Sequence, residues 1–136
     1  MYNKIVVPVD LAHTDRAEMM IETAKRLADG AAQLILVNVV EEFPPHIVNA
    51  LPSHYVENSL ATAKSELQGI ADKAGGDVEV DVRVGHPANA ILAAAEAHGA
   101  DAIVIASHKP ALRDYLLGST AARVVQHAKC SVAVIR

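Results

Sequence analysis

Short apolar runs alternate with helical patterns along the whole chain, and this alternation constrains the fold more than any other feature. The runs consist mainly of Ile, Val, Leu and Ala and have the length of single buried strands. They occupy residues 4–8, 34–40, 101–107 and 131–135. A further strand is expected over residues 78–84, where apolar and charged residues alternate as in a strand with one solvated side at the edge of a sheet. Between these segments, apolar residues recur at intervals of three or four positions, which predicts amphipathic helices. Strand–helix alternation of this kind predicts an α/β open sheet with right-handed crossovers.

Glycine, proline and small polar residues mark the expected ends of the helices. Small polar residues favour the N-cap, proline favours the first turn, and glycine favours the position after the last turn. The start signals are Thr14, Ser53 and Pro87, and the stop signals are Gly30, the pair Gly75 and Gly76, and Gly99. We therefore expect one domain over residues 1–136, a Rossmann-like open sheet of five parallel strands. We expect the strand order 3-2-1-4-5, with helices on both faces of the sheet.

The composition agrees with this fold and argues against several classes of function. Hydrophobic residues make up 51% of the chain but aromatic residues only 3%, as suits a parallel sheet covered by Ala-rich helices. A formal net charge of −4, without any block of Lys or Arg, argues against nucleic acid as the main partner. Without Trp and with few other aromatic residues, a stacking platform for single strands is also not expected.

The sequence also indicates the cellular compartment in which the protein is expected to be located. Cys130 is the single cysteine, which excludes an intramolecular disulfide and fits a reducing cytoplasm. We interpret it as a small residue packed beside the last strand rather than as a reactive thiol. The first residues show no signal-peptide pattern, and no apolar run approaches the length needed to span a bilayer. These features predict a cytoplasmic protein with no membrane partner.

The expected ligand site lies where several strands end. In open α/β sheets, ligands bind outside the carboxyl ends of the strands, where the strand order reverses. The residues at or after those ends are Pro8, Val9 and Asp10, then Val39, and then Ala106, Ser107, His108, Lys109 and Pro110. The last helix is expected to start at Gly118, Ser119 and Thr120, where free amides and hydroxyls favour a bound anion, above all a phosphate.

At these residues the chain resembles the universal stress protein family over essentially its whole length. The first strand ends in Pro-x-Asp (Pro8 and Asp10), which is similar to the family's first-strand signature. Residues 116–136 look like the family's C-terminal helix and strand. Members of the ATP-binding branch carry a Gly-x2-Gly-x9-Gly-Ser/Thr loop over the phosphates. The resemblance therefore implies adenine nucleotide binding, with ATP as the expected ligand and ADP or AMP as alternatives.

The chain departs from that loop pattern. Ala106 stands where the first glycine is expected, the second glycine is absent, and the loop is one residue shorter than the pattern before Gly118 and Ser119. The segments Ser-His-Lys-Pro (107–110) and Tyr-Leu-Leu-Gly-Ser (115–119) resemble the small F/G-type subclass of bacterial universal stress proteins, which is thought to retain nucleotide binding. Lys109 can offset the lost backbone approach with a point charge, and His108 can donate a hydrogen bond. Arg113 either reaches a terminal phosphate or pairs in solvent with an acid.

Two residues at the strand ends have both a ligand-binding and a structural interpretation. Val9 and Val39 offer an aliphatic surface for adenine, although core packing also explains Val39. Asp10 can accept hydrogen bonds from ribose hydroxyls or hold Mg²⁺ through water, or it can be a helix-capping acid in the loop after the first strand. We favour the ligand role, because a lone acid at this strand end faces the crevice. The remaining histidines show no paired spacing, and no dedicated metal site is expected.

Together with the site position, the resemblance implies a stress-response protein that binds an adenine nucleotide and acts as a nucleotide-dependent sensor for an unknown protein partner. Binding is expected to order residues 106–118 and the segment near Pro44 and Pro45. We assign no catalytic residue, so the alternatives are a slow ATP-hydrolysing or phosphotransfer enzyme and a nucleotide-independent dimeric interaction module. A phosphoacceptor receiver domain fits poorly, because the third strand ends in Val84 and Gly85 rather than an acid. If residues 131–136 form a sheet edge, they favour a homodimer, which the resemblance also implies.

Overall fold

The computed structural model describes residues 2–107 and 117–136, and it shows five parallel strands in the order β3-β2-β1-β4-β5. The strands are β1 (Tyr2–Pro8), β2 (Ala28–Glu41), β3 (Val78–Gly85), β4 (Ala102–Ala106) and β5 (Ser131–Ile135). The helices are the 3-10 helix η1 (Thr14–Arg16), α1 (Ala17–Leu27), α2 (Pro45–Val48), α3 (Tyr55–Ala74), α4 (Pro87–His98) and α5 (Ser119–His127). The predicted fold class and strand order are confirmed.

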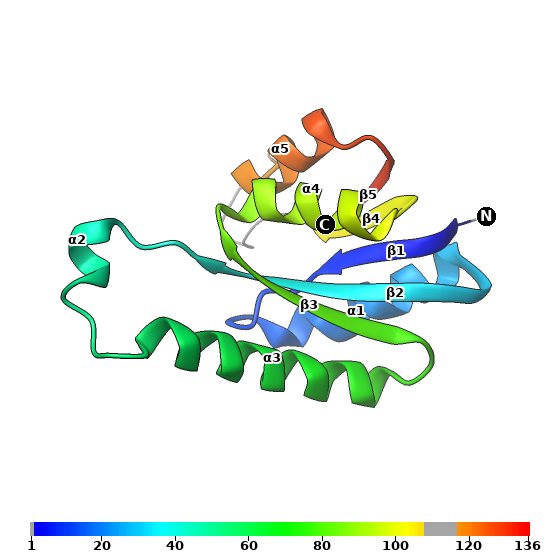
Figure 1. Cartoon of the computed structure of the whole chain (residues 1–136). Coiled ribbons are helices and arrows are strands. Elements are labelled where there is room, and N and C mark those ends of the chain that lie inside the picture. The colour runs from blue at the N-terminus through cyan, green and yellow to red at the C-terminus, as the bar shows by residue number, and fades with distance from the viewer. Residues whose placement is uncertain (1, 108–116) are drawn as a thin grey trace.

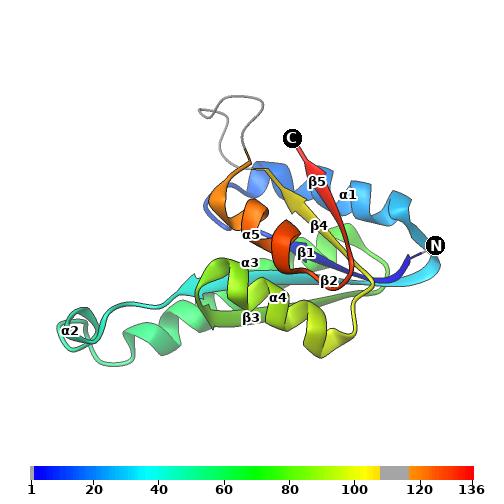
Figure 2. The ribbon, with the colours of Figure 1, turned by 90° about the horizontal axis from the view of Figure 1, so that it is seen from above.

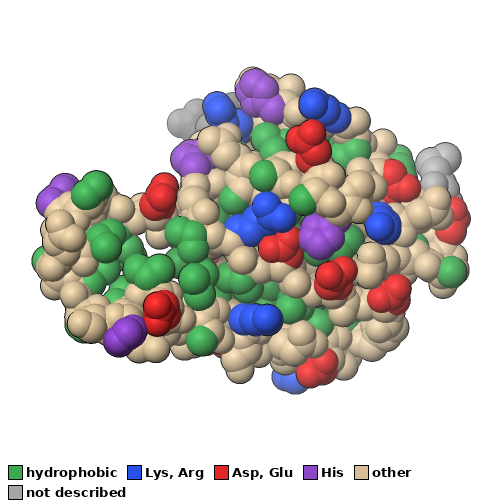
Figure 3. Space-filling model, viewed as in Figure 1, with side chains coloured by type: hydrophobic (Ala, Val, Ile, Leu, Met, Phe, Trp, Pro, Cys, Tyr) green, Lys and Arg blue, Asp and Glu red, His purple; other side chains and the backbone are tan. Residues whose placement is uncertain are grey.

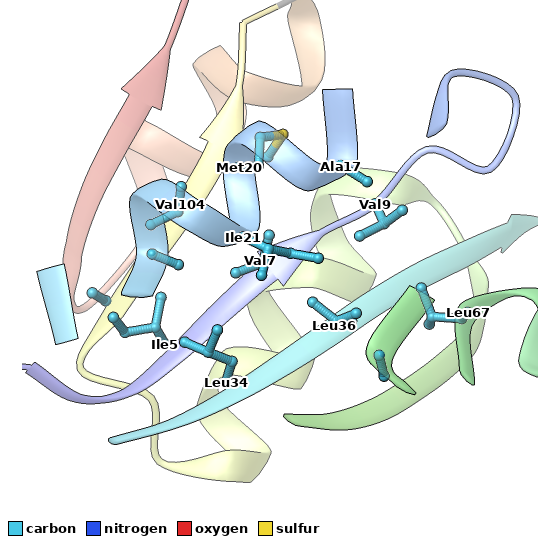
Figure 4. Close-up of a cluster of buried hydrophobic side chains, with 13 residues drawn as sticks. Ile5, Val7, Val9, Ala17, Met20, Ile21, Leu34, Leu36, Leu67 and Val104 are labelled. Atoms are coloured by element: carbon cyan, nitrogen blue, oxygen red, sulfur yellow. The ribbon is translucent and has the colours of Figure 1, made fainter. Parts of the chain in front are cut away.

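Helices cover both faces of the sheet, with α1 and α3 on one face and α4 and α5 on the other (Figures 1 and 2). The period-two alternation of the strands divides the core accordingly. Ile5 and Val7 pack toward α1 and α3, whereas Val6 between them packs toward α4 and α5. Leu34 and Leu36 lie on the α1 and α3 side with Leu67 of α3 (Figure 4). The central strands are therefore buried on both faces, as their unbroken apolar runs require.

Several predicted helix ends are confirmed. Gly99 follows α4 with φ 65°, and Gly75 follows α3 with φ 69°, so both adopt the positive φ that favours glycine. Pro87 occupies the first turn of α4, where its missing amide hydrogen costs no intrahelical bond. The fifth strand covers residues 131–135 as predicted.

Three predicted start or stop signals, those at Gly30, Thr14 and Ser53, are wrong. The first long helix ends at Leu27, and Ala28 already pairs with Tyr2, so Gly30 lies inside β2 rather than beyond the helix. Thr14 begins the short η1 helix instead of capping α1, and no side chain caps either helix. Sheet pairing thus overrides the glycine signal, because the chain enters β2 and pairs with β1 directly after Leu27.

Ser53 is not the N-cap of α3. The helix starts at Tyr55 after His54, which has a positive φ of 64° and whose carbonyl accepts the amide of Asn58 at 2.9 Å. The turn before it is closed by the Tyr55 amide on the Pro52 carbonyl. Residues 42–54, which connect β2 to α3 and contain three prolines, include the four-residue helix α2. This segment projects from the sheet as an arm and carries many of the hydrophobic side chains on the left of Figure 3.

The third strand lies at one edge of the sheet, as its alternating pattern predicted. Its polar residues are not all solvated, however. Asp81 is half-buried, accepts two hydrogen bonds from Arg83 Nε at 3.1 and 3.2 Å, and lies 2.7 Å from His98 Nε2. This cluster ties the last turn of α4 to the edge strand.

Cys130 is half-buried just before β5, as its interpretation as a packed residue anticipated. Burial, and to a smaller degree the nearby charge of Asp101, raises the pKa of its thiol. Asp101 itself accepts the backbone amides of Asn3 at 2.8 Å and Lys4 at 3.1 Å, which joins the start of β4 to the start of β1. Among the helices of the described residues, none is long and apolar enough to cross a membrane.

Candidate functional site

A cavity of about 440 Å³ opens at the carboxyl edge of the sheet, beside the ends of β1, β2 and β4 and the start of α5. Its size falls within the range of small-molecule sites. Eight of the residues predicted from the sequence line it together. They are Pro8, Val9, Asp10, Val39, Ala106, Ser107, Gly118 and Thr120. The convergence expected from the strand ends is therefore present in the fold.

The end of β1 is fixed by hydrogen bonds to β2. The Val9 amide donates to the Val37 carbonyl at 2.8 Å, and Asn38 Nδ2 donates to the Val9 carbonyl at 2.9 Å. Both Val9 and Asn38 are buried, so the floor of the cavity is rigidly held there. The Val9 amide is thus already committed to the sheet, and Val9 offers the cavity mainly its aliphatic side chain.

Asp10 extends from this fixed strand end into the exposed loop before η1. Its Oδ1 accepts the amide of Ala12 at 2.9 Å, and its carbonyl accepts the amide of His13 at 3.0 Å. The helix-capping alternative for Asp10 is wrong, because its side chain bonds an amide within the loop and no side chain caps η1 or α1. A carboxylate has further acceptor positions, so the bond to Ala12 leaves Asp10 able to bind a hydroxyl or a hydrated cation at the cavity.

The end of β4 is held from two sides. The Ser107 amide donates to the Ile135 carbonyl at 2.8 Å, and Arg16 Nη1 donates to the Ser107 carbonyl at 3.2 Å. Ser107 is 9% exposed, whereas Ala106 before it is half-buried. The contact from Arg16 links the segment after β1 with the segment after β4 across the cavity.

The start of α5 supplies the predicted backbone donors. Gly118 is its buried N-cap in extended conformation, and no side chain caps the helix. The first amide bonded within the helix is that of Ala122, which donates to the Gly118 carbonyl at 2.9 Å. The preceding amides of the first turn have no intrahelical acceptor. The positive end of a helix dipole at this position favours an anion in the cavity.

Ser119 lies slightly apart from the other predicted residues. It lines a neighbouring polar groove of about 900 Å³ together with His86, Arg123 and Gln126, and Thr120 lines both the groove and the cavity. His108, Lys109, Pro110 and Arg113 lie outside the described residues. Within the described residues, no group of three or more His, Cys, Asp or Glu side chains is arranged to hold a metal ion.

The prediction missed several residues that line the cavity. Arg16 and Asn38 are the polar residues among them with a side-chain hydrogen bond to the strand ends, and Met20 and Ile91 add apolar wall. Asn38 had a signal in the sequence, because it is the one polar residue within the apolar run 34–40. Arg16 had none, since an arginine at the start of an amphipathic helix is usually solvated.

Comparison with known proteins shows which family the chain belongs to. The model of the universal stress protein family matches residues 1–136. The chain belongs to the universal stress protein family. Among curated relatives, universal stress protein G of Shigella flexneri is 29% identical over 142 residues, covering 100% of both chains.

Solved structures of other proteins share the fold. The hypothetical protein MJ0577 superposes with a TM-score of 0.80 at 29% identity, covering 99% of this chain and 96% of that one. A universal stress protein solved in complex with cAMP gives 0.66 at 25% identity, covering 99% and 97%. One from Archaeoglobus fulgidus, solved with dAMP, gives 0.62 at 27% identity, covering 99% and 98%.

Proposed function

We propose that this universal stress protein binds an adenine nucleotide in the cavity at the carboxyl edge of its sheet, with ATP as the expected ligand. The observation that carries the proposal is the meeting of three strand ends with the uncapped start of α5 around one cavity. An apolar wall beside an anion-binding helix start suits a ligand with a flat apolar base and a phosphate. Relatives of the same fold in complex with cAMP and dAMP support this choice.

Each part of the cavity has a proposed role. Val9 and Val39 provide aliphatic surface for the base, while Gly118 and Thr120 place amides and a hydroxyl near the phosphates. Asp10 binds the ribose hydroxyls or, through water, a Mg²⁺ carried by the nucleotide, because its carboxylate is exposed at the cavity. Mg²⁺ would supply charge neutralisation for the phosphates, and no step of catalysis is assigned to it.

The test is calorimetric titration of the protein with ATP, AMP and cAMP. A double variant, Gly118→Val with Ser119→Ala, is expected to weaken binding at least tenfold, because the larger side chain at position 118 crowds the helix start at the cavity. Gly30→Val with Ser65→Ala makes the same two changes at exposed positions far from the cavity, and Gly30 has open space around it. This control is expected to bind like wild type. Failure of wild type to bind any adenine nucleotide would refute the proposal.

We further propose that nucleotide binding regulates an interaction with a protein partner in the cytoplasm rather than driving rapid turnover. A regulatory role requires that nucleotide changes the surface around the cavity, since a ligand shifts an equilibrium only through different affinity for two states. Phosphate release measured during the same titrations separates the two roles. Turnover of several per second would favour a hydrolytic or phosphotransfer enzyme instead.

The homodimer expected through residues 131–136 remains part of this proposal. β5 is the outermost strand, pairs with β4 on its inner side, and leaves Val132 and Val134 half-buried. An unpaired strand edge with such side chains favours pairing with a second copy. Light scattering at micromolar concentration is expected to give the mass of a dimer, and a monomer mass would contradict it.

A further inference from the structure

Arg16 occupies an unusual position for an arginine near a helix start. It is the last residue of η1 and the N-cap of α1, yet its side chain turns into the cavity and is half-buried. Its Nη1 donates to the carbonyl of Ser107 at the end of β4, at 3.2 Å. The guanidinium therefore lies at the same end of the cavity as Ser107.

The charge of Arg16 is not neutralised by this contact. A carbonyl is a neutral acceptor, and a guanidinium carries five N–H donors, of which the Ser107 carbonyl takes one. Among the described residues, no carboxylate lies within 4.0 Å of Arg16. Charged side chains that are withdrawn from solvent are normally paired with an opposite charge. The missing partner points to an anion that enters the cavity.

The other charges around the cavity strengthen this argument. Among the described lining residues, Asp10 and Glu41 are acidic, and Arg16 is the one Lys or Arg. Two carboxylates repel an anionic ligand, so a phosphate needs a compensating cation nearby. Arginine suits this purpose because its planar fork can donate two parallel hydrogen bonds to phosphate oxygens.

We infer that Arg16 binds the phosphate of the nucleotide and makes the cavity select nucleoside phosphates over uncharged nucleosides. This inference rests on the proposed function and adds a specificity residue to it. The guanidinium uses the Ser107 carbonyl as an anchor and directs its remaining donors at the phosphate. The phosphate is then bound from two sides, by Arg16 and by the start of α5.

The test compares AMP with adenosine, which share the base and the ribose but differ in the phosphate. Arg16→Met keeps most of the apolar stem and removes the guanidinium. It is expected to raise the Kd for AMP about 10- to 100-fold, the loss typical of a hydrogen bond to a charged group, and to change the Kd for adenosine less than about twofold. Arg26→Met, at an exposed position in the last turn of α1, is the matched control and is expected to bind both ligands like wild type.

Arg16→Lys separates charge from geometry and covers the case in which Arg16→Met does not fold, which circular dichroism would reveal. It is expected to bind AMP more weakly than wild type, because an ammonium lacks the planar fork, and to leave the Kd for adenosine unchanged. An equal loss for AMP and adenosine in either variant would show that Arg16 only shapes the loop. Unchanged AMP binding would also overturn the inference.

The wild-type titrations distinguish the inference from the proposed function. Equal affinity for AMP and adenosine would overturn phosphate selection while leaving an adenine site in place. Binding of neither compound, nor of ATP, would overturn both. A preference for AMP that Arg16→Met abolishes is the result that supports both.

Discussion

Asn38 is expected to connect the stability of the fold to the shape of the cavity. Its Nδ2 donates to the Val9 carbonyl at 2.9 Å, and the side chains of Asn38 and Val9 are 9% and 5% exposed. Asn38→Ala removes this donor and leaves the carbonyl of the buried residue Val9 without this hydrogen bond. Such a loss costs about 1–3 kcal/mol of unfolding free energy, and we expect about 2 kcal/mol here.

The assay is urea denaturation at pH 7, followed by circular dichroism, together with the thermal midpoint. For a chain of this size, a loss of about 2 kcal/mol lowers the midpoint by roughly 6 °C. Asn3→Ala is the control, because Asn3 is an exposed residue of a neighbouring strand segment, and it is expected to change stability by less than about 0.5 kcal/mol. If Asn38→Ala and Asn3→Ala have equal stability, the hydrogen bond to Val9 does not hold the end of β1.

Asn38→Asp tests the same contact through pH. The new carboxylate has nearly the shape of the amide but faces the Val9 carbonyl as a second acceptor, and burial disfavours its charge. Both effects raise its pKa in the folded protein above the unfolded value of about 3.9. The protonated form can still donate to the carbonyl, so the variant keeps most of its stability near pH 4. It is expected to lose stability relative to wild type as the pH rises toward 7, and a constant difference would refute this reasoning.

Three further predictions concern the core, a backbone position and the cysteine. Leu67→Ala is expected to cost about 2–5 kcal/mol in urea denaturation, because Leu67 is fully buried in α3 against the sheet, whereas Leu60→Ala at a half-buried position should cost less. Gly99→Ala should destabilise by about 1–2 kcal/mol, because φ is 65° there, while Gly69→Ala inside α3 should stabilise by up to about 1 kcal/mol in the same assay. Cys130 should react with iodoacetamide at pH 7.5 more slowly than a free thiol, since the pKa of its thiol is raised by burial and by the charge of Asp101. Asp101→Asn should therefore increase the rate. A rate for the native protein equal to that of a free thiol would contradict this.

The central strands of the sheet could be predicted from the sequence because they are buried on both faces. Such strands are unbroken apolar runs, and their positions follow from hydrophobicity alone. The errors fall where tertiary contacts decide a local choice. Gly30 would end a helix in isolation, but pairing of Ala28 with Tyr2 draws this segment into β2. His54 takes a positive φ that no simple sequence signal announces.

The location of the candidate site could also be predicted, because strand ends in a parallel sheet meet at one edge. The strand-end residues Pro8, Val39 and Ala106 line one cavity for this reason. The contact between Arg16 and Ser107 could not be predicted, since it joins positions 91 residues apart through a long flexible side chain. Topology determines which segments meet, whereas the paths of individual side chains depend on the packing around them.

Arg16 also bears on Ala106, which stands where the family resemblance implies the first glycine of the phosphate-binding loop. Glycine lets a backbone approach phosphate closely, and an alanine gives up part of that approach. The sequence suggested His108 and Lys109 as substitutes, and both lie outside the described residues. Arg16, in the segment after β1, donates to the carbonyl of the adjacent Ser107. If Arg16 binds phosphate as we infer, Ala106→Gly should improve AMP binding more in the Arg16→Met background than in wild type. The reason is that the guanidinium of Arg16 and a backbone approach at position 106 would each supply hydrogen bonds to the same phosphate, so one matters more when the other is missing. Equal gains in both backgrounds would show that the side chain and the backbone act independently.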